Sequence, residues 1–328
     1  WIVGDPNYNI GIGIGTPTSK LHVKGSAIIT GVATAGIVTA TSIFADRYHG
    51  DTNNNFYAGH FVGSSSTQAS LNIAIGQSSG YSLTCGCDNI FIGQRTGTAL
   101  STSSRNIFMG YAAGEKYAQT GGFGGSIFIG DRAGCNSLTG IYNIGIGVRA
   151  FQGKTGGGNN IAIGFVAGRE DNPTVTNTNS LNVSVGDYAG RTLAAGCCNV
   201  NIGVCAGKYV HSCTTNNSNN TFVGPRAGEG IGYFNYTGCD ISCNVMIGNQ
   251  AGESSNYGPS NSSAQNVLVG NKAFIFGRGA CNIFIGSCAG SSPNNNQAFG
   301  DSNIGIGQSI NMPNRLGSNQ LAIGQTSQ

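Results

Sequence analysis

Charge is scarce in this chain of 328 residues. Only 9% of the residues are Asp, Glu, Lys or Arg, and the formal net charge is +3. Since no basic run stands out, we expect no nucleic-acid partner. Long apolar runs are also missing, and none approaches the ~20 residues of a membrane-spanning helix. We therefore expect no membrane span.

The patterns that carry most catalytic and cofactor chemistry are equally scarce. The four histidines form no HxH or HExxH pattern, and there is no paired CxxC, no GGxGxD repeat and no GxxxxGK[ST] loop. We predict no bound metal, no cofactor and no enzymatic activity. One alternative stays open, because Glu229 and Glu253 occupy the same place in neighbouring repeats and glycan hydrolysis uses two carboxylates. The interpretation that we favour is that they are solvated corner charges.

Glycine, by contrast, is abundant, with 55 residues, and the hydrophobic residues (39%) are arranged in a repeat. The stretch NIFIGQRTG at 89–97 returns along 72–328 in about fourteen copies, most often 17 residues apart. The copies begin at residues 72, 89, 106, 126, 143, 160, 182, 199, 220, 244, 266, 282, 303 and 320.

Alternation within each copy predicts a short β-strand. The residues one and three before the shared glycine are aliphatic in nearly every copy, whereas the residue between them varies. A period of two is typical of a strand with one buried face. We therefore predict that the aliphatic residues form a structural core ladder. Its members include Ile73, Ile75, Ile90, Ile92, Ile107, Ile127, Ile129, Ile144, Ile146, Ile161, Ile163, Ile283 and Ile285.

The variable middle residue is expected on the opposite face. It is Phe in several copies, such as Phe91 and Phe108, and Gly145 in another. We interpret it as a variable surface, and the alternative is an intersubunit face that would favour a trimer.

Asn and Gly are predicted to form the corners. Asn72, Asn89 and Asn106 tolerate turn geometry, and their stacked amides can hydrogen-bond along a ladder. The shared glycines Gly76, Gly93 and Gly110 suit a positive φ or a close backbone approach.

These patterns predict an all-β protein, a β-solenoid or β-roll of about fourteen NIxIGxxAG rungs. Fourteen rungs would stack to roughly 65 Å. We assign 61–328 to this repeat domain and 1–60 to a β-rich N-terminal connector. Because the sequence starts at Trp1 and its last repeat runs to Gln328, we expect a processed product or a part of a longer polypeptide.

Eleven cysteines without a zinc-type spacing favour disulfides in an oxidising setting, with unpaired thiols as the alternative. An odd count leaves at least one cysteine free or bound to another chain. In a homotrimer, bonds between chains need two different positions. The candidates for disulfides are Cys197, Cys198, Cys213, Cys239 and Cys243.

In five repeats the residue two positions after the shared glycine is basic, and these residues would form a row along the stack. It could face anionic glycans. The interpretation that we favour is solubility, or salt bridges to Asp131, Asp187 or a neighbouring chain. Its members are Arg95, Arg132, Arg149, Arg226 and Lys272.

Three segments resemble known virion and surface proteins. GIGIGTPTSKLHVKGSAIITG (11–31) resembles a segment of bacteriophage tail fibres and related trimeric virion proteins, and GIVTATSIFADRYHGD (36–51) resembles short repeats of cyanophage structural proteins. The repeat at 72–328 is similar to head repeats of trimeric autotransporter adhesins. The chain departs from these families in its many cysteines and in having no heptad stalk.

The resemblance implies a homotrimeric, extracellular fibre or adhesive head of a phage virion. Such a protein would act as a rigid spacer that presents loops to a host-surface glycan. It would bind other virion or filament proteins through its N-terminal part. The alternatives are a bacterial surface adhesin or filament subunit and a glycan-depolymerising tailspike.

Overall fold

The computed structural model describes residues 2–4, 6, 10–12, 16, 21–23, 53–119, 122–137, 139–153, 156–171, 180–192, 196–210, 217–231, 241–254, 264–275, 279–291 and 300–324. The chain forms two compact units, Trp1–Arg47 and Tyr48–Gln328.

The first unit contains a three-stranded sheet. Strand β1 (Ile2–Gly4) pairs antiparallel with β2 (Ile10–Ile12), and β2 pairs parallel with β3 (Leu21–Val23). Within the described residues, the predicted β-rich N-terminal part therefore contains strands, whereas 36–50 lies outside these residues.

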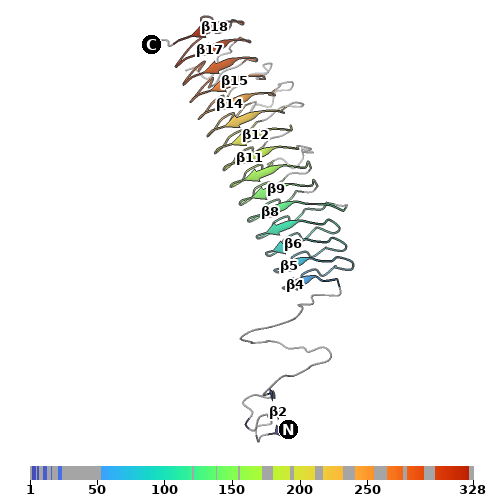
Figure 1. Ribbon diagram of the computed structural model, residues 1–328. Helices are drawn as coiled ribbons and strands as arrows, with labels where there is room; N and C mark the ends of the chain where they lie inside the picture. Colours follow the sequence, from blue (N-terminus) through green and yellow to red (C-terminus); the bar gives the residue numbers. More distant parts are fainter. Residues whose placement is uncertain are drawn as a thin grey trace. The chain divides into compact units, whose positions relative to one another are not determined.

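The second unit is a parallel β-solenoid, as the repeat predicts. Its 15 strands form one sheet in chain order, β4 to β18, and Figure 1 shows them one above another. No helix occurs among the residues that the structure describes. The strands are β4 (Phe56–Ala58), β5 (Ile73–Ile75), β6 (Ile90–Ile92), β7 (Ile107–Met109), β8 (Ile127–Ile129), β9 (Ile144–Ile146), β10 (Ile161–Ile163), β11 (Val183–Val185), β12 (Val200–Ile202), β13 (Thr221–Val223), β14 (Val245–Ile247), β15 (Val267–Val269), β16 (Ile283–Ile285), β17 (Ile304–Ile306) and β18 (Leu321–Ile323).

The predicted domain boundary at residue 60 is wrong, because the solenoid begins earlier. Strand β4 pairs in register with β5, so the stretch NFYAGHFVG (55–63) is a rung that the repeat search missed. Its Asn and both glycines match the repeat, but Phe56 and Ala58 replace the isoleucines that identify the other copies.

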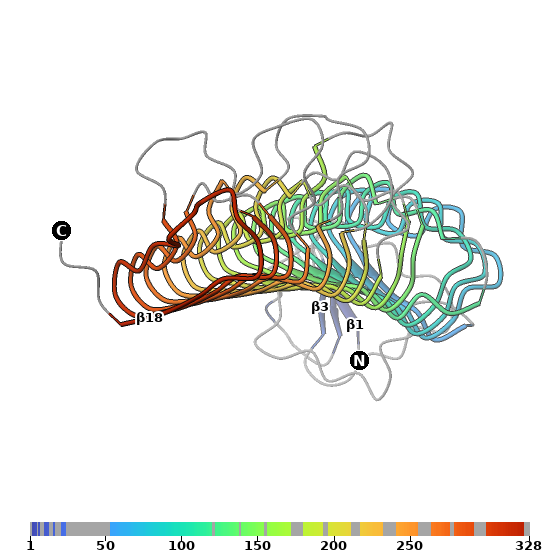
Figure 2. The same ribbon diagram turned by 90° about the horizontal axis from the view of Figure 1, so that it is seen from above.

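Each repeat is numbered here from its Asn. Asn is position 1, the strand covers positions 2–4, the shared glycine is position 5, the second glycine is position 9, and the residue before Asn is position 0. Successive strands pair position for position; Ile90, for example, lies opposite Ile107 and Phe91 opposite Phe108. Figure 2 shows the resulting turns as overlapping loops along a curved path.

The inward face is the opposite of the predicted one. Phe91, Phe108 and Phe128 at position 3 are completely buried, whereas Ile73 at position 2 is 40% exposed and Ile75 at position 4 is 38% exposed. Asn at position 1 has the same parity as position 3 and is also buried. The prediction that the isoleucines form the core of the chain is therefore wrong.

The core is thin, since each rung contributes few side chains to it. Position 3 packs against the small residue at position 8, which is a buried Ala in most rungs. The rings of Phe108 and Phe128 stack at 5.1 Å between centroids, and Tyr117 meets Phe108 edge-on at 5.5 Å. Such aromatic contacts contribute beyond the burial of their area.

Two positions compensate for each other where the pattern changes. Rung β9 has Gly145 at position 3, and Phe151 replaces the usual glycine at position 9. The Phe151 ring stacks on Phe128 with 5.9 Å between centroids, and a Cβ on Gly145 would lie 3.0 Å from that of Phe151. Rung β9 therefore keeps one large side chain in the core.

Asparagine side chains connect the rungs in a continuous ladder. The backbone N–H and the side-chain amide of Asn89 both donate to Oδ1 of Asn72, at 2.9 and 3.0 Å, and Asn106 donates in the same way to Asn89. Ser126 replaces Asn in rung β8; its N–H donates to Asn106, and its hydroxyl accepts from the N–H of Asn143. Buried amides are thus satisfied at most rungs, as burial requires. The exception is Nδ2 of Asn282 in rung β16, which has no hydrogen-bond partner among the described residues.

The shared glycines lie where two backbones approach closely. Gly76, Gly93 and Gly110 have φ values of +122°, +134° and +123°. A Cβ on Gly93 would lie 2.5 Å from the carbonyl oxygen of Gly110 in the next rung, which no real side chain tolerates. Any residue with a side chain would therefore push the rungs apart.

The ladder can be tested with Asn106→Ala. This change leaves the N–H of Ser126 and the Oδ1 of Asn89 with one partner fewer, and we expect a loss of about 2–3 kcal/mol in the free energy of unfolding, measured by urea denaturation. Asn106→Ser is the matched control, because serine already serves in rung β8, and it should cost clearly less. Equal costs for the two variants would contradict the proposed role of the amide.

The orientation of the strands can be tested with Phe108→Ala. The change removes a fully buried ring and should cost about 3–5 kcal/mol in urea denaturation. Tyr111→Ala, at an exposed neighbouring position of the same rung, is the control and should cost less than about 1 kcal/mol. A smaller loss of stability for Phe108→Ala than for Tyr111→Ala would contradict the burial of position 3.

Candidate functional site

The most prominent surface of the solenoid is an aliphatic face made by positions 2 and 4 of strands β5–β18. Every side chain in these two columns except Thr221 is aliphatic or Met. Each one is exposed or half-buried in the chain. In Figure 1 the strands that carry it follow one another along the stack. The isoleucines predicted as core all lie here. They are Ile73, Ile75, Ile90, Ile92, Ile107, Ile127, Ile129, Ile144, Ile146, Ile161, Ile163, Ile283 and Ile285.

Positions 0 and 7 form the two borders of the aliphatic face. Both positions have left-handed backbone geometry, and apart from Gly125 in rung β8 none of these residues is glycine; in rung β6, Asp88 has a φ of +57° and Arg95 a φ of +59°. Such geometry is costly for ordinary residues and persists only where the surroundings impose it. The hydrogen bond from the N–H of Arg95 to the carbonyl of Gln77 (2.8 Å) is part of that constraint.

The predicted basic row occupies position 7. All five members have left-handed φ values, and the side chains are half-buried or exposed. The residues are Arg95, Arg132, Arg149, Arg226 and Lys272.

Two members of the row form ion pairs, though not with the predicted aspartates. Arg95 pairs with Glu115 of the next rung. Arg226 pairs with Glu229 of its own rung (Nε to Oε2, 2.7 Å) and with Glu253 of the next. These glutamates all occupy position 10, so position 7 of one rung lies beside position 10 of the next.

The other expected partner, Asp187, binds backbone instead. Its carboxylate accepts from the N–H of Phe165 at 2.9 Å. The Arg132 guanidinium lies 5.5 Å from the centre of the Tyr111 ring. Salt bridges within the chain therefore account for Arg95 and Arg226 of the row.

The same rung geometry brings Glu229 and Glu253 to the guanidinium of Arg226. Burial raises the pKa of Glu253, whose side chain is 7% exposed, and the charge of Arg226 opposes that shift. Gln250 also donates to this carboxylate at 2.5 Å. Sequence reasoning missed this burial, because the glutamate was expected at a solvated corner.

The cysteines in the described part of the chain are free thiols. Cys198 and Cys243 are exposed and Cys197 is half-buried; Cys213 and Cys239 lie outside the described residues. Cys198 and Cys243 both occupy position 0, two rungs apart. At about 4.8 Å per rung they are roughly 10 Å apart, beyond disulfide reach.

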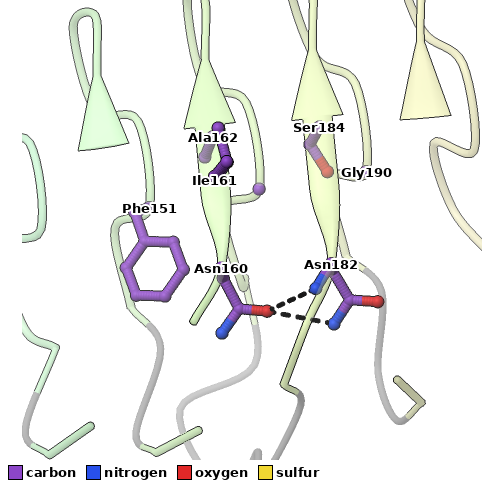
Figure 3. A pocket seen from close by; sticks show the side chains of 8 residues that line it. Phe151, Asn160, Ile161, Ala162, Asn182, Ser184 and Gly190 are labelled. Atoms are coloured by element: carbon purple, nitrogen blue, oxygen red, sulfur yellow. Dashed lines mark hydrogen bonds between the residues drawn. The ribbon is translucent and has the colours of Figure 1, made fainter. Parts of the chain in front are cut away.

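A cavity in the interior of the solenoid is too small to hold a ligand. A small cavity lies between β10 and β11, beside Ala162 and Ser184 and close to the Phe151 ring (Figure 3). Figure 3 also shows Asn182 donating two hydrogen bonds to Asn160 at its edge. Its free volume of about 10 Å³ suits at most one water molecule.

The outside carries one shallow depression around an ion pair. It surrounds Arg95 and Glu115 and is open to solvent. The other residues that line it are Gln77, Ser78, Tyr81, Gln94 and Thr98.

Among the described residues there is neither a cluster of metal ligands nor a helix that could span a membrane. No group of three or more His, Cys, Asp or Glu side chains in this part of the chain could hold a metal ion. Within the same residues, no helix is long and apolar enough to cross a membrane.

Comparisons with known protein families, with curated proteins and with solved structures give no match.

The burial of Glu253 predicts a pH dependence of stability. Because its pKa in the folded chain is raised above 4.5, the unfolded value, the stabilisation from its protonated form is lost as the pH rises through the folded pKa. Glu253→Gln removes this loss, so its free energy of unfolding relative to the parent should increase between pH 4 and pH 7. Urea denaturation across this range measures the difference. A difference that decreases with pH would mean that Arg226 outweighs burial.

Proposed function

We propose that the chain is a structural fibre protein that acts as a rigid spacer and presents its turns for attachment to a host surface. The observation that carries this proposal is the unbroken register of 15 strands, with a continuous aliphatic face along them. Backbone hydrogen bonds join each rung to the next. This arrangement favours a stiff rod over a protein that closes around a ligand.

Self-association into a homotrimer is part of the proposal. Monomeric soluble proteins rarely expose a contiguous apolar patch larger than a few hundred Å². The aliphatic face holds two side chains in each of fourteen rungs, including Ile163 at 37% exposure and Ile247 at 41%. Three copies around an axis parallel to the stack would bury all three faces against one another and leave the turns in solvent.

The setting in a phage virion, outside the cell, rests on the resemblance of 11–31 and 36–51 to tail-fibre and cyanophage structural segments. A bacterial surface adhesin or filament subunit is the alternative from the same structural class. The position-7 row, with Arg132 and Arg149 in consecutive rungs, borders the face that the trimer would bury, so we assign contact with host glycans to the turns beyond this row.

The assembly is tested by measuring the mass of the full chain in solution. Light scattering should give three times the 33.4 kDa of one chain. Electron microscopy should show straight rods, and incubation with host-surface polysaccharide should leave the polymer length unchanged. A monomer with a stable fold would refute the trimer, and shortened polysaccharide would refute the structural role in favour of a depolymerase.

The role of the aliphatic face is tested with the double variant Ile107→Lys and Ile129→Lys. Two charges on each face cannot be buried together without counterions, so the variant should elute as a monomer that keeps its β-sheet circular dichroism. Ala118→Lys, at an exposed position outside the face, is the control and should keep the parental mass. A trimeric double variant would show that another surface mediates assembly.

A further inference from the structure

Two rungs of the solenoid each carry a pair of cysteines at the borders of the aliphatic face. Rung β12 has Cys198 at position 0 and Cys205 at position 7, and rung β16 repeats the arrangement with Cys281 and Cys288. All four are free thiols; Cys198 and Cys281 are exposed, and Cys205 and Cys288 are half-buried. Their φ values, +60°, +58°, +60° and +55°, place all four in the same left-handed corner geometry.

Neither pair can close within its own chain. The strand Val200–Ile202 lies between Cys198 and Cys205, and three extended residues alone span roughly 10 Å. Disulfides need Cα atoms about 4.4–6.8 Å apart. The adjacent rungs do not help either, since β13 has Asn219 and Arg226 at these positions.

A three-fold assembly brings the two borders together. In cross-section, three equivalent faces around an axis parallel to the stack form a triangle, so the first border of one face meets the second border of the next. Rotation about that axis keeps each rung at its own height. Position 0 of one copy therefore meets position 7 of its neighbour in the same rung, and all three corners are alike.

The other rungs support this pairing of positions 0 and 7. Rung β6 has Asp88 and Arg95, rung β9 has Tyr142 and Arg149, and β11 has Leu181 and Tyr188. Across such a corner they would form an ion pair, a cation–π pair and an apolar pair, respectively, with Arg95 also paired to Glu115 of its own chain. No rung from β5 to β17 carries like charges at these two positions, as the described residues of both columns show.

We propose that Cys198 bonds to Cys205 of the neighbouring copy, and Cys281 to Cys288, so that two rings of three interchain disulfides lock the fibre covalently. The proposal rests on the homotrimer proposed above. The rings would lie four rungs apart, roughly 19 Å along the stack. Three copies of one cysteine could not all pair with each other, whereas two different positions satisfy every thiol in the ring.

The chemistry requires an oxidant, and a low-molecular-weight disulfide such as oxidised glutathione supplies it. The Cys198 thiolate attacks that disulfide and releases one glutathione thiolate. The Cys205 thiolate of the neighbour then attacks the mixed disulfide and releases the second. Each bond thus consumes one oxidised glutathione and two protein thiols, and each ring consumes three oxidised glutathiones.

Cys243 provides an internal control. It occupies position 0 of rung β14, with the same exposure as Cys198, but Gln250 stands at position 7 of that rung. It therefore has no partner thiol at the same height. An antiparallel two-fold pairing about rung β14 would instead join Cys243 to Cys243 and Cys198 to Cys281, so the two geometries predict different bonds.

The test uses the full chain, purified reduced and then oxidised with glutathione disulfide at a pH near 8.5. Burial raises the pKa of the Cys205 thiol, so mild alkali is needed to form its thiolate. On a denaturing non-reducing gel, the parent and Cys243→Ser should run at three chains. A chain with Cys281→Ser and Cys288→Ser should also run at three chains, because the β12 ring remains.

Adding Cys198→Ser to that double variant should convert all covalent trimer to monomer on the gel, while light scattering still reports three chains. Mixing isotopically heavy and light chains should give Cys198–Cys205 peptides with one heavy and one light half. Peptides joining Cys198 to Cys281, or Cys243 to Cys243, would overturn the proposal. A native trimer without interchain bonds would refute the rings alone, whereas a native monomer would refute the homotrimer as well.

Discussion

The hydrogen-bonded register between successive rungs is the constraint on which the rest of the structure depends. Each N–H of a strand donates to a residue of the neighbouring rung, as Ile90 does to Asn106 at 2.8 Å. The Asn ladder adds a side-chain bond at nearly every level, from Asn55 to Gln320. Because a slip by one residue would expose position 3 and bury position 2, this register defines inside and outside for the whole stack.

The register also explains why so small a core suffices. The side chain at position 3 and the small residue at position 8 lie in the core of each rung, and in several rungs an apolar residue at position 12, such as Leu83, Leu100 or Tyr117, joins them. Their neighbours lie in the rungs above and below. Polar residues at position 3, Ser184 and Asn201, separate two apolar clusters of the core. Stability in such a stack is close to a sum of neighbouring contacts, so a local polar break is tolerated.

On the outside, the same register converts a repeated residue into a continuous surface. Two apolar columns need another surface to cover them, and a second and third copy carry columns of matching spacing. In the homotrimer that we propose, the borders of the face would become the contacts between copies, and the charges of rung β6 and the thiols of rungs β12 and β16 would share this geometric explanation. The stiffness of the stack, the proposed assembly and the proposed cross-links would thus all result from the same repeat.

The sequence by itself determined the solenoid, the position of the strands and the parity of their side chains. Period-two alternation requires Ile90 and Ile92 to share one face and Phe91 to occupy the other, and glycine and asparagine mark the corners. It did not decide which face is buried in the chain, since both are apolar in many rungs. A signal was present, because Asn at position 1 shares its face with position 3 and a hydrogen-bonded amide ladder had been expected at position 1. It also missed the first rung at 55–63, where Phe56 and Ala58 replace the isoleucines.

Only the tertiary structure decided the direction in which the chain turns after each strand. The left-handed residues at positions 0 and 7 set the turns on the two sides of the strand, and they include Arg, Tyr, Leu and Cys, which have no intrinsic preference for such geometry. Burial of Glu253 and the meeting of Arg226 with two glutamates depend on how position 7 of one rung packs beside position 10 of the next, which spacing along the chain does not reveal. Backbone packing between rungs, rather than local propensity, is the physical reason in both cases.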